Sequence, residues 1–183
     1  MVFMRKIIAV VGMPASGKTE AVKIFKRNGF YNVYFGDPVF DRLKKEGLKI
    51  NESNEREIRE KMRSEGGMAV MAKESIPKIE EELKKGNVVI ESMYSWEEYK
   101  LIKEKYGSKF KVLAIRASPA TRYKRLRNRN KRPLKEKEAI SRDYSQLENL
   151  NTGGPIAMAD FVIVNEGSLK SFKIKVKKLI ENL

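Results

Sequence analysis

Residues 12–19 read Gly-Met-Pro-Ala-Ser-Gly-Lys-Thr, which matches the phosphate-loop pattern G-x-x-x-x-G-K-[ST]. Glycines at the first and sixth positions let the backbone curl, so that several N–H groups point at phosphate oxygens. The Lys18 ammonium can reach β- and γ-phosphates, and the Thr19 hydroxyl can bind Mg²⁺. The stretch therefore predicts a site for a nucleoside triphosphate with Mg²⁺, where the dipole of the following helix adds to the attraction for anions.

The sequence on both sides of the loop supports this interpretation. Residues 7–11, Ile-Ile-Ala-Val-Val, are uncharged and mostly β-branched, as in a buried parallel strand. After the loop, apolar residues recur at helical spacing, and Gly29 stands where a helix C-terminal cap is expected. The alternative is a glycine turn with a chance lysine, and the strand-loop-helix order favours the phosphate loop.

Length and composition limit the remaining choices. The 183 residues suffice for one sizeable core, so we expect a single domain over 1–183. The sequence has no cysteine and no histidine, which excludes disulfides, thiolate metal sites, imidazole bases and histidine-ligated metals. The apolar stretch 7–16 is too short to span a membrane, and no secretory signal precedes it. We therefore expect a soluble, cytoplasmic protein with no membrane partner.

The net charge of +15 has two interpretations. Excess positive charge attracts polyanions such as nucleic acid. Alternatively, lysines interleaved with glutamates form the highly charged surface that is typical of thermophilic proteins. We favour the second interpretation, because most lysines stand beside glutamates on the polar faces of expected helices. The oligomeric state stays open.

Strand-like and helix-like segments alternate along the chain, which predicts an α/β fold with a parallel sheet. Between residues 55 and 85 the pattern is helical, with expected breaks at 66–67 and at Pro77, and its methionines are interpreted as core. The expected strands are Lys6 to Val11, Asn32 to Phe35, Asn87 to Glu91, Phe110 to Arg116 and Asp160 to Val164.

Two acidic residues follow expected strands, at the sheet edge where ligands bind in open parallel sheets. Asp37 could meet Mg²⁺ through water or accept a proton from a substrate hydroxyl, or it could cap the next helix. Glu91 stands where a Walker B carboxylate would, and we expect it to contact Mg²⁺ through water. Trp96 and Tyr99, just beyond it, could stack on a base or pack a helix start, and the capping box of Ser95 with Glu98 favours packing.

A basic run covers residues 122–135, with eight basic and no acidic side chains. Arg125 and Arg129 are four residues apart, which places them on one face of an expected helix, and Arg142 follows on a second helix. We expect residues 122–152 to form a mobile lid that closes over the triphosphate. A nucleic-acid-binding arm and a solvated basic helix are the alternatives.

Three further motifs carry a resemblance to a family. Gly36-Asp37 follows the second expected strand, and Arg125-Leu126-Arg127-Asn128-Arg129 has the pattern R-L-x-x-R. Near the end, Ala159-Asp160 and Val164-Asn165-Glu166-Gly167-Ser168 have the pattern A-D-x-x-I-x-N-x-G-S. With the phosphate loop, these motifs resemble the P-loop kinases of the nucleoside monophosphate kinase and dephospho-coenzyme A kinase superfamily, above all the adenylate-kinase-related, dephospho-coenzyme A kinase-like proteins. The resemblance covers nearly the whole chain.

The resemblance implies a three-layer P-loop NTPase fold with a five-stranded parallel sheet in the order 2-3-1-4-5, a helical lid and an acceptor-binding region near 37–86. It implies that Lys18, Asp37, Arg129 and Arg142 are catalytic, and that Thr19 and, through water, Glu91 serve the metal. The residues it assigns to ATP are Gly12, Ala15, Ser16, Gly17, Lys18, Thr19, Arg125, Asn165, Glu166 and Gly167.

The sequence departs from the family pattern at two places. Adenylate kinases have an arginine three residues after the aspartate, where this chain has Phe40, and related proteins have Asp-Gly where it has Glu91-Ser92. We predict an ATP- and Mg²⁺-dependent phosphotransferase acting on dephospho-coenzyme A or a nucleoside monophosphate. The alternatives are a nucleotide-gated binding protein that associates with RNA and hydrolyses ATP slowly, and a P-loop protein that binds nucleotide without turnover.

Overall fold

Each apolar run that predicted a strand forms one in the computed structural model, which describes residues 5–130 and 132–183. The strands pair in parallel in the order β2-β3-β1-β4-β5, which confirms the predicted fold. They are β1 (Ile7–Val11), β2 (Tyr31–Tyr34), β3 (Val88–Glu91), β4 (Phe110–Arg116) and β5 (Phe161–Val164).

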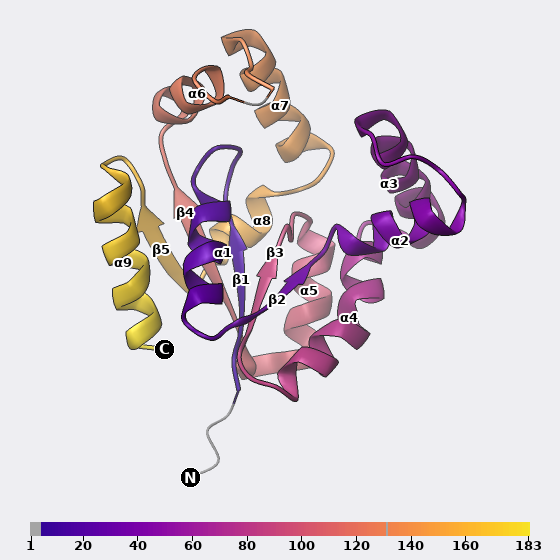
Figure 1. The fold of residues 1–183 in the computed structure, drawn as a ribbon, viewed down its shortest axis with the longest axis horizontal. Helices are drawn as coiled ribbons and strands as arrows, with labels where there is room; N and C mark the ends of the chain where they lie inside the picture. The colour runs from indigo at the N-terminus through magenta and orange to yellow at the C-terminus, as the bar shows by residue number, and fades with distance from the viewer. Residues whose placement is uncertain (1–4, 131) are drawn as a thin grey trace.

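Helices follow the strands and connect them (Figure 1). They are α1 (Lys18–Arg27), α2 (Asp37–Lys45), α3 (Glu52–Gly66), α4 (Val70–Leu83), α5 (Trp96–Tyr106), the short 3-10 helix η1 (Gly107–Lys109), α6 (Pro119–Arg127), α7 (Glu136–Glu148), α8 (Gly153–Ala157) and α9 (Leu169–Glu181).

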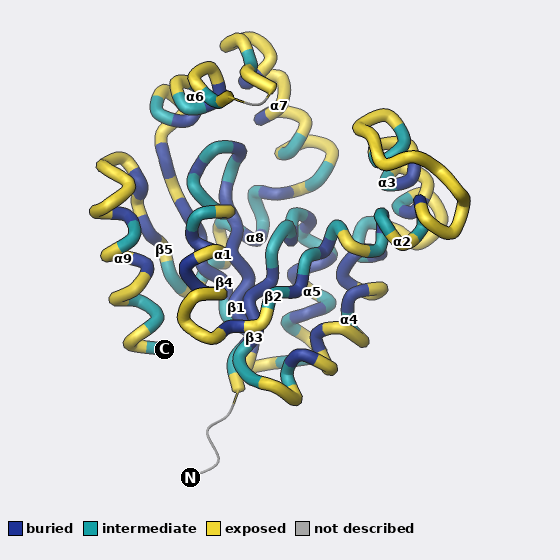
Figure 2. The backbone as a smooth tube through the Cα atoms, viewed as in Figure 1, coloured by how far each residue is buried: buried dark blue, intermediate teal, exposed yellow. Residues whose placement is uncertain are grey.

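The sheet lies between two helical layers, as Figure 1 shows. On one face, Ile8 and Val10 of the central strand pack with α1 and α9, while on the other face Ile7, Ala9 and Val11 pack with the layer of α2 to α5. All five residues of β1 are buried, because β3 and β4 pair with it on both sides and helices cover both faces (Figure 2). This position explains why the strand has no polar residue in alternation.

Two predicted helix breaks have different outcomes. α3 ends at Gly66 and α4 begins at Val70, with Gly67 between them at φ 79°, so the first break is confirmed. The break at Pro77 is wrong, because α4 runs through this residue. Pro77 and the residue one turn before it, Lys73, are exposed, so water can reach the carbonyl that lacks an N–H partner.

The methionines of α3 and α4 support the same layer. Met62 and Met71 are buried in the cluster that includes Ile58 and Ile79, which confirms their interpretation as core.

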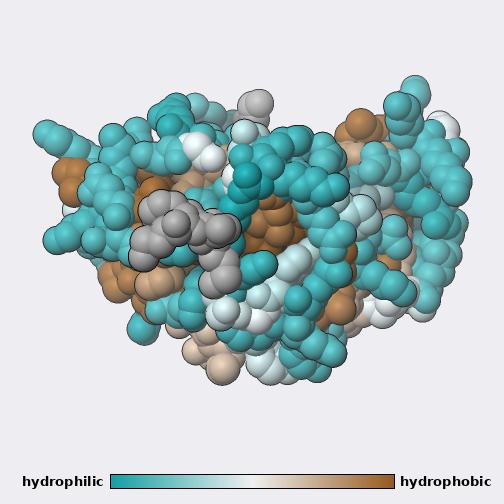
Figure 3. Space-filling view, turned by 90° about the horizontal axis from the view of Figure 1, so that it is seen from below, coloured by the Kyte–Doolittle hydropathy of each residue, from teal (hydrophilic) through white to brown (hydrophobic). Residues whose placement is uncertain are grey.

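Most of the surface seen from below is hydrophilic, with separate hydrophobic patches (Figure 3). Within residues 5–130 and 132–183, no helix has the length and apolar content needed to cross a membrane.

Candidate nucleotide-binding site

The loop between β1 and α1 has the backbone shape that its glycines predict. Gly12 and Gly17 have φ of 143° and 114°, which side chains rarely adopt, and Ala15 also has a positive φ of 60°. A Cβ atom at Gly12 would lie 2.4 Å from the Ile115 carbonyl oxygen, and one at Gly17 would lie 2.5 Å from the Asn165 amide nitrogen. The backbone of β4 beside Gly12 and the Asn165 side chain beside Gly17, together with the positive φ angles, therefore favour glycine at both positions.

Lys18 lies inside the curl of this loop. Its ammonium donates hydrogen bonds to the carbonyl oxygens of Gly12, at 2.7 Å, and Met13, at 3.1 Å. Burial, followed by the positive charges of Arg142 and Arg122, lowers the pKa of Lys18 to about 8. An anion in the loop would offset all three effects, because it supplies negative charge and hydrogen-bond acceptors.

Ser16 provides a second sign that the loop is built for a ligand. Its side chain is 1% exposed, and its hydroxyl has no hydrogen-bond partner among the described residues. A buried hydroxyl without a partner costs free energy unless a ligand or water satisfies it. Phosphate oxygens in the loop would do so.

A cavity of about 140 Å³ opens over the loop and brings together groups far apart in the sequence. Six of its lining residues were predicted: Ala15, Lys18, Thr19, Glu91, Arg129 and Arg142. The same cavity holds residues to which the sequence analysis gave no role in the site: Pro14, Ser92, Tyr94, Leu126 and Gln146.

The Thr19 hydroxyl and the Glu91 carboxylate give this cavity two oxygen donors of the kind that Mg²⁺ prefers. Burial raises the pKa of Glu91, so the carboxylate would be stabilised by a cation beside it. Among the described residues, no group of three or more acidic side chains could hold a metal alone. The pair therefore fits a magnesium ion that keeps waters and phosphate oxygens as its other ligands.

Ser92 explains a departure noted in the sequence. It has φ 67°, in the left-handed region that favours glycine, and it lines the cavity directly after Glu91. The glycine of the family pattern described above would adopt that backbone shape without strain. The departure from Asp-Gly to Glu91-Ser92 was visible in the sequence, and it was the feature of the sequence that pointed to Ser92.

Arg125 and Arg129, which were predicted to belong to a lid, lie in different surroundings. The prediction that Arg125 and Arg129 share a helical face is wrong, because α6 ends at Arg127 and Arg129 lies beyond it. Arg125 donates to the carbonyl oxygens of Ala15, at 3.3 Å, and Asn165, at 2.8 Å, so it bridges the phosphate loop and the end of β5. Arg129 faces the cavity, where burial and Arg142 lower its pKa.

The segment after β5 holds the loop from the other side. The Asn165 amide donates to the Ser16 carbonyl oxygen at 2.8 Å. Glu166 accepts hydrogen bonds from Ser118 and Thr121 at the start of α6, and these bonds lower its pKa. Gly167 lies in the turn before α9, with open space around it. None of these three residues lines the cavity over the loop.

A buried ion pair joins α6 and α7. The Arg122 guanidinium donates to both carboxylate oxygens of Asp143, at 2.8 and 2.7 Å, and to the Pro14 carbonyl oxygen at 3.3 Å. The Tyr123 hydroxyl donates to the same carboxylate at 3.0 Å. The sequence placed Arg122 in the basic run without a partner, because the 21 residues that separate the pair hide the contact.

Asp37 and the aromatic pair Trp96–Tyr99 do not reach the cavity over the loop. Asp37 begins α2, where burial and then Asp41 raise its pKa. Trp96 stacks on Tyr99 with ring centroids 4.9 Å apart, and a Cβ at Gly154 would touch the Trp96 ring. Ser95 and Glu98 form the predicted capping box, so these rings pack the start of α5.

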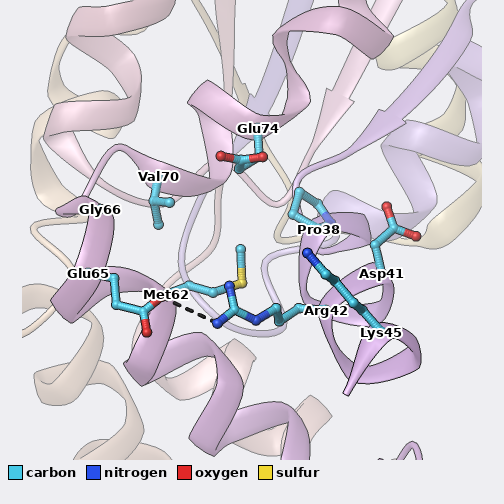
Figure 4. A pocket seen from close by; sticks show the side chains of 9 residues that line it. All are labelled: Pro38, Asp41, Arg42, Lys45, Met62, Glu65, Gly66, Val70 and Glu74. Carbon is cyan, nitrogen blue, oxygen red and sulfur yellow. Dashed lines mark ion pairs between the residues drawn. The ribbon is translucent and has the colours of Figure 1, made fainter. Parts of the chain in front are cut away.

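A larger hollow of about 390 Å³ lies between α2, α3 and the start of α4 (Figure 4). Charges of both signs line it, and Arg42 pairs with Glu65 at 3.6 Å across it. It contains no residue of the phosphate loop, so we do not assign the nucleotide to it.

Comparison with protein families supports this geometry. Residues 8–146 match the family model described as AAA domain. The chain is 35% identical over 181 residues to a UPF0200 protein of Thermococcus sibiricus, covering 97% of this chain and 95% of the relative. It is 33% identical over 181 residues to a UPF0200 protein of Thermococcus kodakarensis, covering 97% of each.

Solved structures show the same architecture at low sequence identity. A shikimate kinase from Bacteroides thetaiotaomicron matches 97% of each chain with a TM-score of 0.59 and 14% identity. A dephospho-CoA kinase from Campylobacter jejuni matches 98% of this chain and 95% of its own with a TM-score of 0.56 and 18% identity. The fold is therefore that of P-loop kinases.

Proposed function

We propose that this chain, which belongs to the UPF0200 family and has the fold of P-loop kinases, is an ATP- and Mg²⁺-dependent phosphotransferase that acts on a nucleotide-like acceptor. The observation that carries the proposal is the single cavity lined by Lys18, Thr19, Glu91, Arg129 and Arg142. Three cationic groups, a hydroxyl and a carboxylate are the parts that phosphoryl transfer requires.

The chemistry needs little beyond positioning and charge. Negative charge spreads over the oxygens of the transferring phosphoryl group, and nearby cations stabilise it. Lys18 and the loop N–H groups would hold the β- and γ-phosphates, while Arg129 and Arg142 would face the transferring group. Mg²⁺ beside Thr19 and Glu91 would neutralise phosphate charge when bound. The absence of histidine from the sequence is compatible with this chemistry.

The arrangement of α6 and α7 supports a closing role for residues 122–152. Figure 1 shows both helices beyond the carboxyl ends of the strands, with the phosphate loop beneath them. Arg142 comes from α7 and Arg129 from the connection between the helices. A small rotation of this pair would change how closely both arginines approach the phosphates and would exclude water.

The test is incubation with Mg-ATP and a panel of acceptors, with products identified by mass spectrometry. The panel contains nucleoside monophosphates, dephospho-coenzyme A, shikimate and gluconate. A phosphorylated product that disappears in Lys18→Ala but persists in Lys23→Ala supports the proposal, because Lys23 is an exposed lysine of the same helix. Absence of any product from the whole panel, in protein that binds ATP, would contradict it.

A second candidate function has its own observation. Arg27, Lys170, Lys173 and Lys177 line one groove between α1 and α9, in a chain of net charge +15. Such a basic groove suits the phosphate backbone of RNA, with nucleotide binding as the switch. Affinity for a single-stranded RNA should then fall steeply with salt. Weak binding at low salt would exclude this function.

A further inference from the structure

A second, smaller cavity lies beside the nucleotide site and combines rings with arginines. It measures about 60 Å³. α2, α3 and the segment after β3 enclose it, with Val39 and Met71 among its apolar walls. The groups that carry its chemistry are Tyr34, Phe40, Arg59, Arg63 and Tyr94.

The two arginines are one helical turn apart on α3 and point into this cavity. The Arg63 Nε atom is buried without a hydrogen-bond partner, and burial lowers the pKa of this guanidinium. Within the part of the chain that the structure describes, neither arginine forms an ion pair, whereas the exposed Arg56 on the same helix pairs with Glu60 at 3.0 Å. Glu55 and Glu98 also line the cavity, but among the described residues neither pairs with these arginines, so the two inward guanidinium groups still offer donors to an anion.

The rings give the cavity a planar wall. Tyr34 and Phe40 stack with centroids 6.3 Å apart and an angle of 28° between the ring planes. A Cβ at Gly36 would lie 2.3 Å from the Tyr34 ring, so glycine is needed at this position to leave the ring in place. Phe40, which stands where adenylate kinases have an arginine, thus contributes a ring, and α3 supplies the positive charge instead.

This cavity adjoins the nucleotide site. Ser92 and Tyr94 line both spaces, and the Tyr94 hydroxyl donates to the Ser92 hydroxyl at 3.4 Å. A molecule held by the arginines would therefore face the end of a triphosphate bound in the phosphate loop.

We infer that this cavity is the phosphate-binding part of the acceptor subsite: Arg59 and Arg63 bind the phosphate group of a phosphomonoester with a planar ring, such as a nucleoside monophosphate, and the rest of that molecule extends out of the cavity. The inference rests on the proposed function. An oxygen of the acceptor phosphate attacks the γ-phosphorus of ATP and forms a new P–O bond. The bond between the γ-phosphorus and its bridging oxygen breaks, and ADP leaves with the electron pair.

The carboxylates nearby agree with this acceptor class. A phosphate oxygen is already ionised and needs no base, whereas a hydroxyl acceptor needs one. Asp37 lines neither cavity. Glu55 and Glu98 line the smaller one. The Glu98 carboxylate accepts hydrogen bonds from the N–H groups of Tyr94 and Ser95, at 2.7 and 2.9 Å, as part of the capping box. Its position is fixed by the start of α5 rather than by a substrate.

The test separates binding from turnover. Calorimetry measures AMP, CMP, UMP and GMP, with adenosine, shikimate and gluconate as comparisons, each in the presence of Mg-ADP. We expect at least one monophosphate to bind and adenosine, which lacks the phosphate, to bind at least ~10-fold more weakly. Binding of shikimate or gluconate without binding of any monophosphate would overturn the inference. Since no step of this assay needs catalysis, it remains informative if the proposed transfer fails.

Variants then test the two arginines. Arg59→Gln and Arg63→Gln should each weaken monophosphate binding by about 10- to 100-fold, since each removes a charge-assisted contact. Arg56→Gln is the matched control on the same helix and should change the affinity for the monophosphate less than ~2-fold. The affinity for ATP should likewise change less than ~2-fold in all three variants. If Arg63→Gln unfolds the protein, Arg59→Gln decides alone. Unchanged monophosphate binding in a folded Arg59→Gln protein would overturn the inference.

Discussion

Replacing Asp143 by alanine should strongly destabilise the protein, because it leaves the buried charge of Arg122 unpaired. Arg122 and Asp143 are each 4% exposed, and two hydrogen bonds of 2.7 and 2.8 Å join them. Removing one partner of a buried ion pair costs about 3–5 kcal/mol. For a chain of this length, each kcal/mol lowers the melting temperature by about 2–4 °C, so we expect a loss of about 6–20 °C.

Calorimetric or circular dichroism melting measures this loss. The control is Glu20→Ala, which breaks an exposed pair with Lys23 and should cost less than about 1 kcal/mol. The double variant Arg122→Met/Asp143→Leu should lose less than Asp143→Ala, since it removes both charges. If Asp143→Ala melts within ~2 °C of Glu20→Ala, the reasoning about the buried pair is refuted. Because Arg142 is the adjacent residue on α7, Asp143→Ala should also lower any transferase activity.

Three other perturbations have defined outcomes. Lys18, whose pKa is lowered to about 8 by burial and Arg142, should take up a proton when a triphosphate binds at pH 9; calorimetry in two buffers that shows no uptake contradicts this. Burial raises the Glu98 pKa to about 7 from 4.5, so the folded state binds more protons than the unfolded state, and its stability falls as pH rises from 4.5 through 7. Glu98→Gln should flatten this pH profile of stability, measured by urea titration. An unchanged profile would refute the role of Glu98. Pro77→Ala restores an N–H donor to the Lys73 carbonyl and should raise the free energy of unfolding by roughly 1 kcal/mol, measured by urea titration. A lower urea midpoint in the variant would show that proline stabilises the helix at this position.

Local patterns predicted the parts of the site that local chemistry defines. The loop 12–19 needs glycines at fixed positions and a lysine and threonine after them, so eight consecutive residues specify its shape. The box of Ser95 with Glu98 likewise begins a helix where expected. In these cases the residues that interact are at most a few positions apart.

Contacts between side chains on segments far apart in the sequence could not be predicted from local patterns. Arg125 and Arg129 have the same chemistry and ideal helical spacing, yet α6 ends between them and only Arg129 faces the cavity. Arg59 and Arg63 have the same spacing on a helix rich in charged residues, and nothing in the sequence distinguishes them from Arg56. The helix orientation decides which guanidinium is buried.

The sequence by itself determined the fold class, the phosphate loop and the class of ligand it would take, because hydrophobic period and loop glycines act over short stretches. Only the tertiary structure decided which acidic and basic side chains meet. It brought Glu91, Arg129 and Arg142 over the loop, left Asp37 outside, paired Arg122 with Asp143 and turned Arg59 and Arg63 toward the rings of Tyr34 and Phe40. The physical reason is that burial and distance set the strength of charge interactions, and both depend on how the helices pack on the sheet.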